Sequence, residues 1–204
     1  MRVLGIMSGT SCDGLDLCDA DIYIDLFYKL KFNINSFDTI PFTDSEKSQL
    51  LSSRDIGKNE LSKIETQITE IFIDKINSFM GTTNFDIISC HGHTVKHIDR
   101  VLSIQLLDYK LLYEIFKKPI VYDFRSRDIL HSGTGAPLMP LLDWLLFSDQ
   151  DRDVITLNIG GISNISYIPR NNNRNQVVGF DTGPGMSLIE TLLNMKILDE
   201  WLND

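Results

Sequence analysis

The sequence predicts an α/β fold built from two related lobes, and three observations support this prediction. The first forty residues contain three strand-like stretches separated by turn residues, the pattern of a three-stranded meander. Strand-like and helix-like segments then alternate up to residue 150. After residue 150 the strand–turn–strand–turn–strand opening recurs. A repeated opening of this kind indicates a duplicated architecture.

The meander should contain strands over residues 2–7, 17–25 and 31–40. The first stretch is apolar, the second alternates imperfectly, and the third alternates apolar with polar residues. Pro41 ends the third strand, because proline cannot donate to a strand ladder. Residues 8–14, rich in glycine and serine, form the loop between the first two strands.

A helix is expected over residues 59–80, with Asn59 as its N-cap and Gly81 as its left-handed stop. The charged residues Lys63, Glu70 and Asp74 lie off its apolar face. That face is formed by residues that recur with helical period: Leu61, Ile64, Ile68, Ile71, Phe72, Phe79 and Met80.

The rest of the first lobe alternates buried strands with a short helix. Residues 86–90 and 120–124 are apolar enough for buried strands. Between them, Asp108 caps a helix that Pro119 stops. We place the first lobe at residues 1–135 and expect it to be complete or nearly so.

The second lobe, residues 136–204, should begin with a helix over 137–147, which is apolar nearly all round and suits packing between two layers. Strands over 154–159, 162–168 and 176–180 should follow, with an Asn-rich turn at 171–175 before the third and a helix from about residue 185. Three strands and one helix do not cover both faces of a sheet, so we expect a truncated second lobe.

Composition excludes several classes of function. The net charge of -9 and the pI near 4.8 speak against nucleic acid or an anionic membrane as partner, since both require a basic surface. No run of about 18 apolar residues occurs, so we expect no membrane span. The cysteines Cys12, Cys18 and Cys90 show no CxxC spacing, which favours reduced thiols and a cytoplasmic protein. Apolar surface left bare on an incomplete second lobe should cause self-association, a homodimer included.

Two glycine-containing turns are candidate phosphate-binding sites. The loop at 8–14 offers glycines for close backbone approach, and Asp13 and Asp16 are candidate magnesium ligands. A second turn, Gly160-Gly161, opens the second three-strand unit. Two related turns are expected where two lobes clamp one nucleotide. The chain has no GxxxxGK motif followed by Ser or Thr, which excludes a P-loop. An ordinary Gly/Ser hairpin turn is the alternative for each.

Asp181 is a candidate general base. It follows the strand at 176–180, and in open α/β sheets ligands collect at the carboxyl ends of strands. The alternative is an aspartate that caps the next helix.

The segment His91-Gly92-His93-Thr94, with His97, follows a buried strand. Two histidines at this spacing are found in zinc and iron sites, which makes a metal-dependent hydrolase using His91 and His93 an alternative function. His131, Asp123 and Asp128 would have to complete that site. The other interpretation is a hydrogen-bonding loop.

Arg125, after the strand at 120–124, suits a carboxylate or phosphate of a ligand. An Arg–Asp pair that fastens a loop is the alternative.

Taken together, these segments resemble the anhydro-N-acetylmuramic acid kinases, a branch of the sugar kinase/Hsp70/actin superfamily with a ribonuclease H-like fold. The resemblance runs through essentially the whole chain and is carried by six motifs: MSGTSCDGLD at 7–16, CHGHTVKH at 90–97, YDFRSRD at 122–128, GTGAPLMP at 133–140, NIGGISN at 158–164 and GFDTGPG at 179–185. It implies an enzyme that uses ATP and Mg²⁺ to open and phosphorylate 1,6-anhydro-N-acetylmuramic acid, giving N-acetylmuramic acid 6-phosphate in cell-wall recycling.

The resemblance also implies roles for individual residues. Asp181 would be the base that activates water. Thr94, Arg125 and Asp128 would face the amino sugar. The ATP phosphates would be bound by the loop residues Gly9, Thr10, Ser11, Cys12, Asp13, Gly14, Leu15 and Asp16.

This sequence departs from the family pattern at three positions. The family usually has Leu where Cys12 stands, Gln where His93 stands and Asn where Met186 stands. Family members also continue well past residue 204, so a non-catalytic sugar- or nucleotide-binding remnant is the second interpretation.

Overall fold

The computed structural model describes residues 1–24, 30–53, 60–81, 84–170 and 173–194. The chain divides into two compact units, Met1–Gly135 and Ala136–Asp204, and each is described by itself. Asp25, Asn59 and residues 171–172 of the Asn-rich turn, all of which entered the predictions above, lie outside the described residues.

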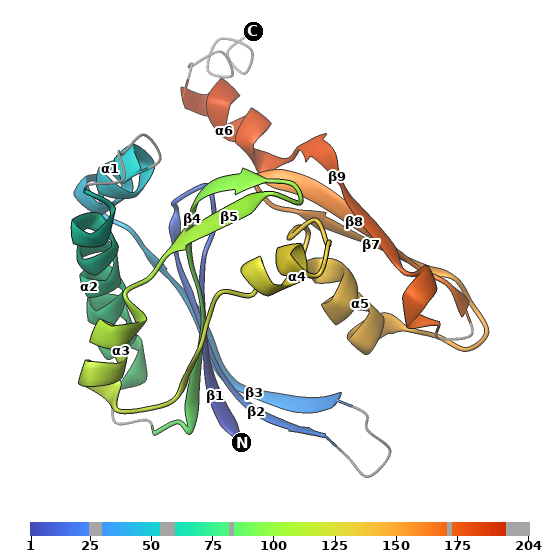
Figure 1. Cartoon of the computed structure of the whole chain (residues 1–204), viewed down its shortest axis with the longest axis horizontal. Coiled ribbons are helices and arrows are strands. Elements are labelled where there is room, and N and C mark those ends of the chain that lie inside the picture. Colours follow the sequence, from blue (N-terminus) through green and yellow to red (C-terminus); the bar gives the residue numbers. More distant parts are fainter. Residues whose placement is uncertain (25–29, 54–59, 82–83, 171–172, 195–204) are drawn as a thin grey trace, which may run out of the picture. The chain divides into compact units, whose positions relative to one another are not determined.

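The first unit contains a mixed six-stranded sheet (Figure 1). Its strands are β1 (Arg2–Ser8), β2 (Gly14–Ile24), β3 (Leu30–Pro41), β4 (Ile87–Ile98), β5 (Leu102–Leu106) and β6 (Ile120–Val121). Their order is β3-β2-β1-β4-β5, with β6 also paired to β4. The β1–β4 and β4–β6 pairs are parallel and the others antiparallel, the arrangement of a ribonuclease H-like sheet. The predicted α/β fold is confirmed.

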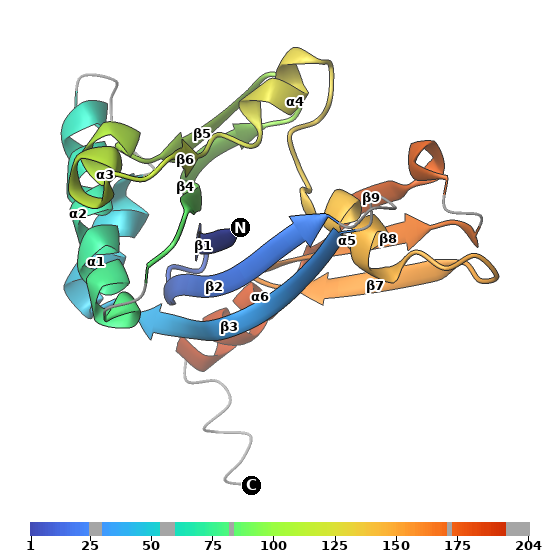
Figure 2. The ribbon, with the colours of Figure 1, turned by 90° about the horizontal axis from the view of Figure 1, so that it is seen from below.

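Three helices cover one face of this sheet: α1 (Asp44–Ser52), α2 (Leu61–Met80) and α3 (Tyr109–Phe116), as Figures 1 and 2 both show. The core lies between them and the sheet. Ile68, Phe72 and Ile76 of α2 are fully buried in one cluster with Leu4 and Ile88 of the strands. Burial of each such side chain stabilises the fold by roughly 1.5–3 kcal/mol.

The predicted apolar face of α2 is confirmed. Its members are buried or packed against the core, whereas Lys63, Glu70 and Asp74 are exposed. Gly81 follows the helix with a positive φ of 53°, as expected of a glycine stop. Asp108 caps α3 by accepting hydrogen bonds from the amides of Lys110 and Leu111.

Several elements of the first unit differ from the predictions. Helix α1 was not predicted, although Thr43 and Glu46 form a capping box that the Thr-x-x-Glu spacing signals. Strand β4 continues to Ile98, so the His-rich segment is a strand and not a loop, because it pairs with β5, a strand that the sequence also did not predict.

Strand β6 is shorter than the predicted 120–124. Asp123 has a left-handed φ of 56°, which ends the extended backbone. The short helix α4 (Ser126–Leu130), which was not predicted, then begins with its first amide bonded to Asp123 Oδ1 at 3.2 Å.

The second unit contains an antiparallel sheet of order β7-β8-β9 and two α-helices. Its elements are α5 (Met139–Phe147), β7 (Val154–Ile159), β8 (Ile162–Ile168), the 3₁₀ turn η3 (Arg174–Gln176), β9 (Val178–Pro184) and α6 (Met186–Asn194). Strand β9 is shifted toward the C-terminus from the predicted 176–180, because residues 174–176 form the turn η3.

Helix α5 packs on one face of this sheet through a buried carboxylate. Asp143 Oδ2 accepts hydrogen bonds from the hydroxyls of Thr156 at 2.7 Å and Ser166 at 2.6 Å, two residues that pair across β7 and β8. Away from this contact α5 carries exposed apolar side chains, with Leu145 and Phe147 at 41% and 51%. Packing of a second layer against that side of α5 stays a prediction.

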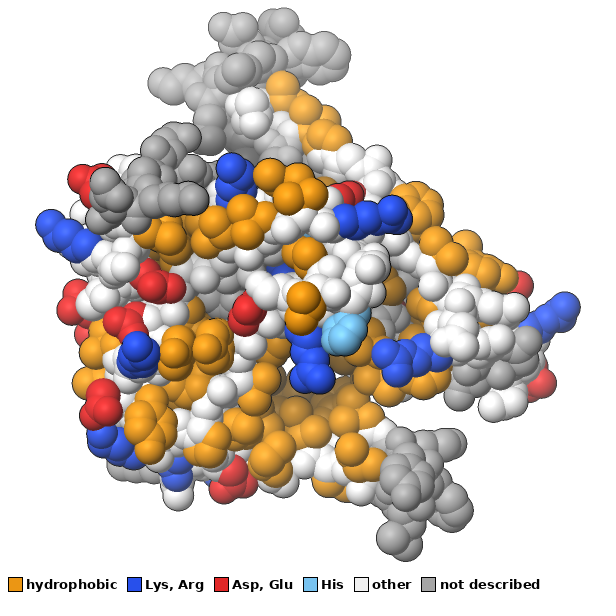
Figure 3. Space-filling model, in the orientation of Figure 1, with side chains coloured by type: hydrophobic (Ala, Val, Ile, Leu, Met, Phe, Trp, Pro, Cys, Tyr) orange, Lys and Arg blue, Asp and Glu red, His pale blue; other side chains and the backbone are white. Residues whose placement is uncertain are grey.

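The opposite face of the small sheet is apolar and open to solvent. Two rows of residues cross this face from β7 through β8 to β9. One row is Ile155, Tyr167 and Val178, and the other is Leu157, Ile165 and Phe180. These six residues are called the bare face below. Ile155 is 68% exposed and Leu157 61%. Hydrophobic side chains are visible along these strands at the right of Figure 3. No described helix is long and apolar enough to cross a membrane.

Candidate functional site

The first glycine turn, residues 9–13, connects β1 to the antiparallel β2. The turn is closed by the amide of Cys12, which donates to the carbonyl of Gly9 at 3.3 Å, and Cys12 has a left-handed φ of 58°. The side chains of Cys12 and Leu15 are fully buried in the core. Any contact of these two residues with a ligand is therefore made by backbone groups.

The two carboxylates of this segment have protein partners. Asp13 Oδ1 lies 2.8 Å from Lys47 Nζ, and Asp16 Oδ1 accepts a hydrogen bond from Thr39 Oγ1 at 2.6 Å. The hydrogen bond from Lys47 lowers the pKa of Asp13 below its ordinary value. Asp13 is therefore ionised at neutral pH, the state that a magnesium ligand requires.

Helix α1 supports this turn from the side, which the sequence did not reveal. The amide of Phe42, just before α1, donates to the Asp13 carbonyl at 3.1 Å. The buried Lys75 of α2 binds the start of α1 through Glu46 Oε2 at 2.9 Å and the Pro41 carbonyl at 3.0 Å. The turn thus rests on a helix that is itself anchored to the core.

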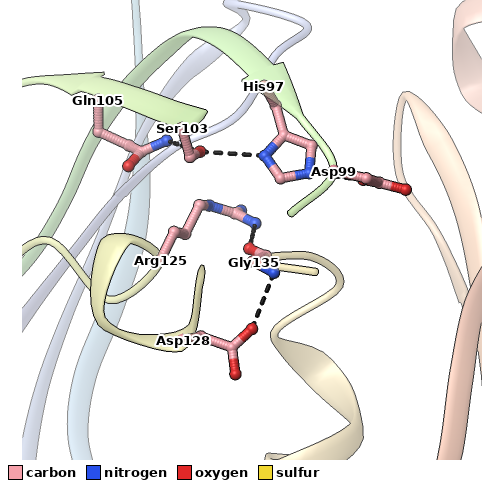
Figure 4. A network of polar contacts seen from close by, with 7 residues as sticks. All are labelled: His97, Asp99, Ser103, Gln105, Arg125, Asp128 and Gly135. Carbon is pink, nitrogen blue, oxygen red and sulfur yellow. Dashed lines mark hydrogen bonds and ion pairs between the residues drawn. The ribbon is translucent and has the colours of Figure 1, made fainter. Parts of the chain in front are cut away.

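The predicted sugar-facing residues of the first unit lie in two groups of polar contacts. Figure 4 shows Arg125 and Asp128 at Gly135, and beside them Gln105, the hydrogen-bond partner of Thr94. Arg125 Nη1 donates to the Gly135 carbonyl at 2.8 Å, and Asp128 Oδ2 accepts from the Gly135 amide at 2.8 Å. Thr94 Oγ1 accepts a 3.4 Å hydrogen bond from Gln105. The structure brings Arg125 and Asp128 together on one residue, Gly135, where both fasten the segment that ends the first unit.

His91 forms the other contact of Arg125. Its Nε2 lies 2.9 Å from Arg125 Nε, and its Nδ1 lies 3.0 Å from the Gly92 carbonyl. Burial, assisted by the charge of Arg125, lowers the pKa of His91 to about 4. His91 is therefore neutral at physiological pH.

His93 has a different neighbour, which bears on the metal-hydrolase alternative. It is fully buried, and its Nδ1 lies 3.2 Å from Ser8 Oγ of β1. The His93 ring thus contacts β1, whereas the His91 ring contacts Arg125. Among the described residues, no group of three or more His, Cys, Asp or Glu side chains is arranged to hold a metal ion. The geometry gives the hydrolase interpretation no support.

A pocket of about 430 Å³ opens in the first unit next to this network, a volume within the range of small-molecule sites. Tyr109 and Tyr122 stack at one side, with ring centroids 4.5 Å apart. His91 and Gln105, the partners of Arg125 and Thr94, line it, whereas Thr94, Arg125 and Asp128 do not. Sequence reasoning missed Gln105, because β5 was not predicted. It also missed the two tyrosines, whose stacking joins the start of α3 to the segment after β6 and is not visible in local spacing.

Asp181 lies within β9 and not beyond its end as predicted, because the strand continues to Pro184. Its side chain is exposed. Register places Asn158, Asn164 and Asp181 in one row across β7, β8 and β9. The row brings the motif at 158–164 next to the motif at 179–185.

Asp181 does not cap the following helix. It lies five residues before α6, which begins at Met186. The Met186 amide donates instead to the Gly160 carbonyl at 2.8 Å, and Ser187 Oγ donates to the Gly161 carbonyl at 2.7 Å. The carbonyls of the second glycine turn therefore hold the start of α6. The Asp181 carboxylate has no part in capping this helix.

Comparison with known proteins agrees with these motifs. The family model for anhydro-N-acetylmuramic acid kinase matches residues 1–201. The chain is 34% identical over 201 residues to the anhydro-N-acetylmuramic acid kinase of Nitrosomonas europaea, with 93% of this chain and 53% of that protein covered. The protein of the same name from Neisseria meningitidis serogroup C is 37% identical, with 92% and 52% covered.

A third relative so named, from Haemophilus influenzae, is 32% identical, with 98% of this chain and 50% of that protein covered. The chain thus spans about half the length of these relatives. A match across residues 1–201 includes both glycine turns, the network around Arg125 and the strand of Asp181. The chain belongs to the anhydro-N-acetylmuramic acid kinase family.

Proposed function

We propose that this protein is an ATP-dependent kinase that opens and phosphorylates 1,6-anhydro-N-acetylmuramic acid, acting in the cytoplasm in cell-wall recycling. One observation carries the proposal: the family match extends over residues 1–201 and includes Asp181 together with every phosphate- and sugar-facing motif named above. Because the chain spans about half of its relatives, activity of these 204 residues is part of the proposal.

In the proposed reaction, Asp181 accepts a proton from water as the water oxygen attacks the anomeric carbon. The bond from that carbon to the bridge oxygen breaks, and the bridge oxygen forms a bond to the γ-phosphorus of ATP as ADP leaves. The exposed position of Asp181 beside Asn164 supports this role, because a general base must be reached by water.

The first unit would bind both substrates. Backbone amides of residues 9–14 suit phosphate oxygens, and ionised Asp13 with Asp16 suits Mg²⁺, which supplies charge stabilisation on the phosphates when bound. Thr94, Arg125 and Asp128 would bind the sugar, and the adjoining pocket offers hydroxyl, amide and aromatic groups suited to a polar ring.

The test is a product assay in ¹⁸O-labelled water. Purified protein, Mg-ATP and 1,6-anhydro-N-acetylmuramic acid are incubated, and the product is analysed by mass spectrometry. We expect a 6-phosphate sugar with ¹⁸O at the anomeric position, absent with Asp181→Asn and present with Asp151→Asn, a control in an exposed turn.

The full-length Nitrosomonas europaea relative serves as a parallel reaction. If it forms product and this chain does not, the kinase proposal fails for the 204 residues. Calorimetry with the sugar and with Mg-ADP then tests the second candidate, a non-catalytic binding protein.

A further inference from the structure

We propose that His91 is a positioning residue that fixes the guanidinium of Arg125 for the sugar. The inference rests on the proposed function, in which Arg125 faces the substrate. It gives the first histidine of the His-Gly-His motif a role other than metal binding, since the described residues form no metal-binding cluster. Arg125 Nε donates a hydrogen bond to His91 Nε2 at 2.9 Å.

That hydrogen bond determines the tautomer of His91. An arginine Nε–H can only donate, so His91 Nε2 must carry a lone pair. The Gly92 carbonyl, 3.0 Å from Nδ1, can only accept, so Nδ1 must carry the proton. A single neutral tautomer satisfies both contacts, and the imidazolium form would have to give up the bond to Arg125.

The backbone around His91 maintains this arrangement. Gly92 has a φ of 76°, at an irregularity in the β1–β4 register, and this turns its carbonyl toward the His91 ring. A Cβ at Gly92 would lie 2.9 Å from the Leu106 carbonyl oxygen, so only glycine fits. His91 itself is 6% exposed, and its ring stacks on Phe124 at 6.4 Å between centroids.

Arg125 is held at a second point. Its Nη1 donates to the Gly135 carbonyl at 2.8 Å, as Figure 4 shows. A planar guanidinium held at two of its nitrogens has both its plane and its direction fixed. Loss of the His91 contact would remove the anchor at Nε and with it one constraint on the direction of the group. Misplacement of a substrate-orienting group by about 1 Å can cost on the order of 100-fold. For a residue that binds the anhydrosugar, we expect this loss in kcat/KM for that substrate.

The test compares His91→Phe, which keeps a flat ring without an acceptor, with His91→Gln, whose amide oxygen reaches about as far as Nε2. We expect His91→Phe to raise the KM for the anhydrosugar about ten-fold or more, since the substrate meets a misplaced guanidinium. The KM for ATP should stay the same. His91→Gln should restore most of the sugar KM. A uniform loss of kcat with both substrates' KM unchanged would overturn the inference.

A second measurement needs no activity. In ¹⁵N NMR of the wild-type protein, His91 should show a protonated Nδ1 and an unprotonated Nε2. The Arg125 Nε–H signal should shift in His91→Phe and stay in place in His91→Gln. An Nε2–H tautomer would overturn the inference whether or not product forms. Correct NMR signals with no product from any variant would instead count against the proposed function for this chain.

Discussion

The ammonium group of Lys47 lies 2.8 Å from the Asp13 carboxylate, so the first helix is tied to the candidate phosphate-binding turn by an ion pair. Both side chains are partly exposed, at 41% and 53%, and such pairs contribute about 0–1 kcal/mol to stability. The larger consequence concerns the charge state of the turn. The pair keeps Asp13 ionised over a wider pH range than an isolated aspartate.

Replacing Lys47 with Met should raise the pKa of Asp13 toward its ordinary value. A depressed carboxyl pKa stabilises the folded state above the unfolded-state pKa, and this stabilisation is lost as pH falls through the folded-state pKa. The variant should therefore be slightly less stable at neutral pH and equal to wild type in strong acid. NMR titration of the Asp13 carboxyl carbon and urea unfolding at several pH values measure the two effects. Lys96→Met, at an exposed lysine of β4, is the control and should change neither.

The buried His91 should also make the free energy of unfolding depend on pH, in the range between its folded-state pKa and its ordinary pKa. Its pKa is about 4 in the folded state, against an ordinary value of 6.5, so the unfolded chain binds more protons between these values. The free energy of unfolding should therefore fall as pH is lowered from about 6.5 to 4, by on the order of 3 kcal/mol. His91→Gln has no such group. The difference between the two unfolding curves measured from pH 7 to pH 4 isolates the effect, and a constant difference would contradict it.

The carboxylate of Asp143 should be the main polar support of the second unit. Asp143→Ala leaves the hydroxyls of Thr156 and Ser166 without their acceptor, so we expect a loss of about 2–3 kcal/mol in the free energy of unfolding. Asp143→Asn keeps one acceptor oxygen and should lose less. Urea unfolding followed by tryptophan fluorescence compares them, since Trp144 is the next residue on α5. Equal losses for Ala and Asn would show that the acceptor oxygen is not what matters.

The bare face of the small sheet should drive self-association of this chain. Contiguous exposed apolar surface is costly in water and promotes contact between molecules. Ile155→Thr together with Leu157→Lys should shift the protein toward monomer in size-exclusion chromatography with light scattering. The matched control is Val101→Lys on the first unit, where the valine has the same 68% exposure as Ile155 but lies in the turn after β4. A wild-type protein that is monomeric at high concentration would refute this prediction.

Periodicity in the sequence was sufficient for the strongly patterned elements. The apolar face of α2, the Asp108 cap of α3 and the meander of β1 to β3 follow from local spacing and capping, which depend on residues close in sequence. Helix α1 was missed although its capping box is local. The segment after Cys90 was predicted as a loop because it is polar. It is a strand because it pairs with β5, and local spacing does not reveal that pairing.

The sequence by itself determined the α/β class, the family and the identity of the chemical groups, because motifs and periodicity are properties of neighbouring residues. Only the tertiary structure decided what those groups contact. Lys47 reaches Asp13 across 34 residues, and Arg125 reaches His91 across 34 as well. Asn158, Asn164 and Asp181 share one row only because of strand register. Hydrogen bonds between such distant residues, and the pKa values that follow from them, depend on backbone positions that no local pattern contains.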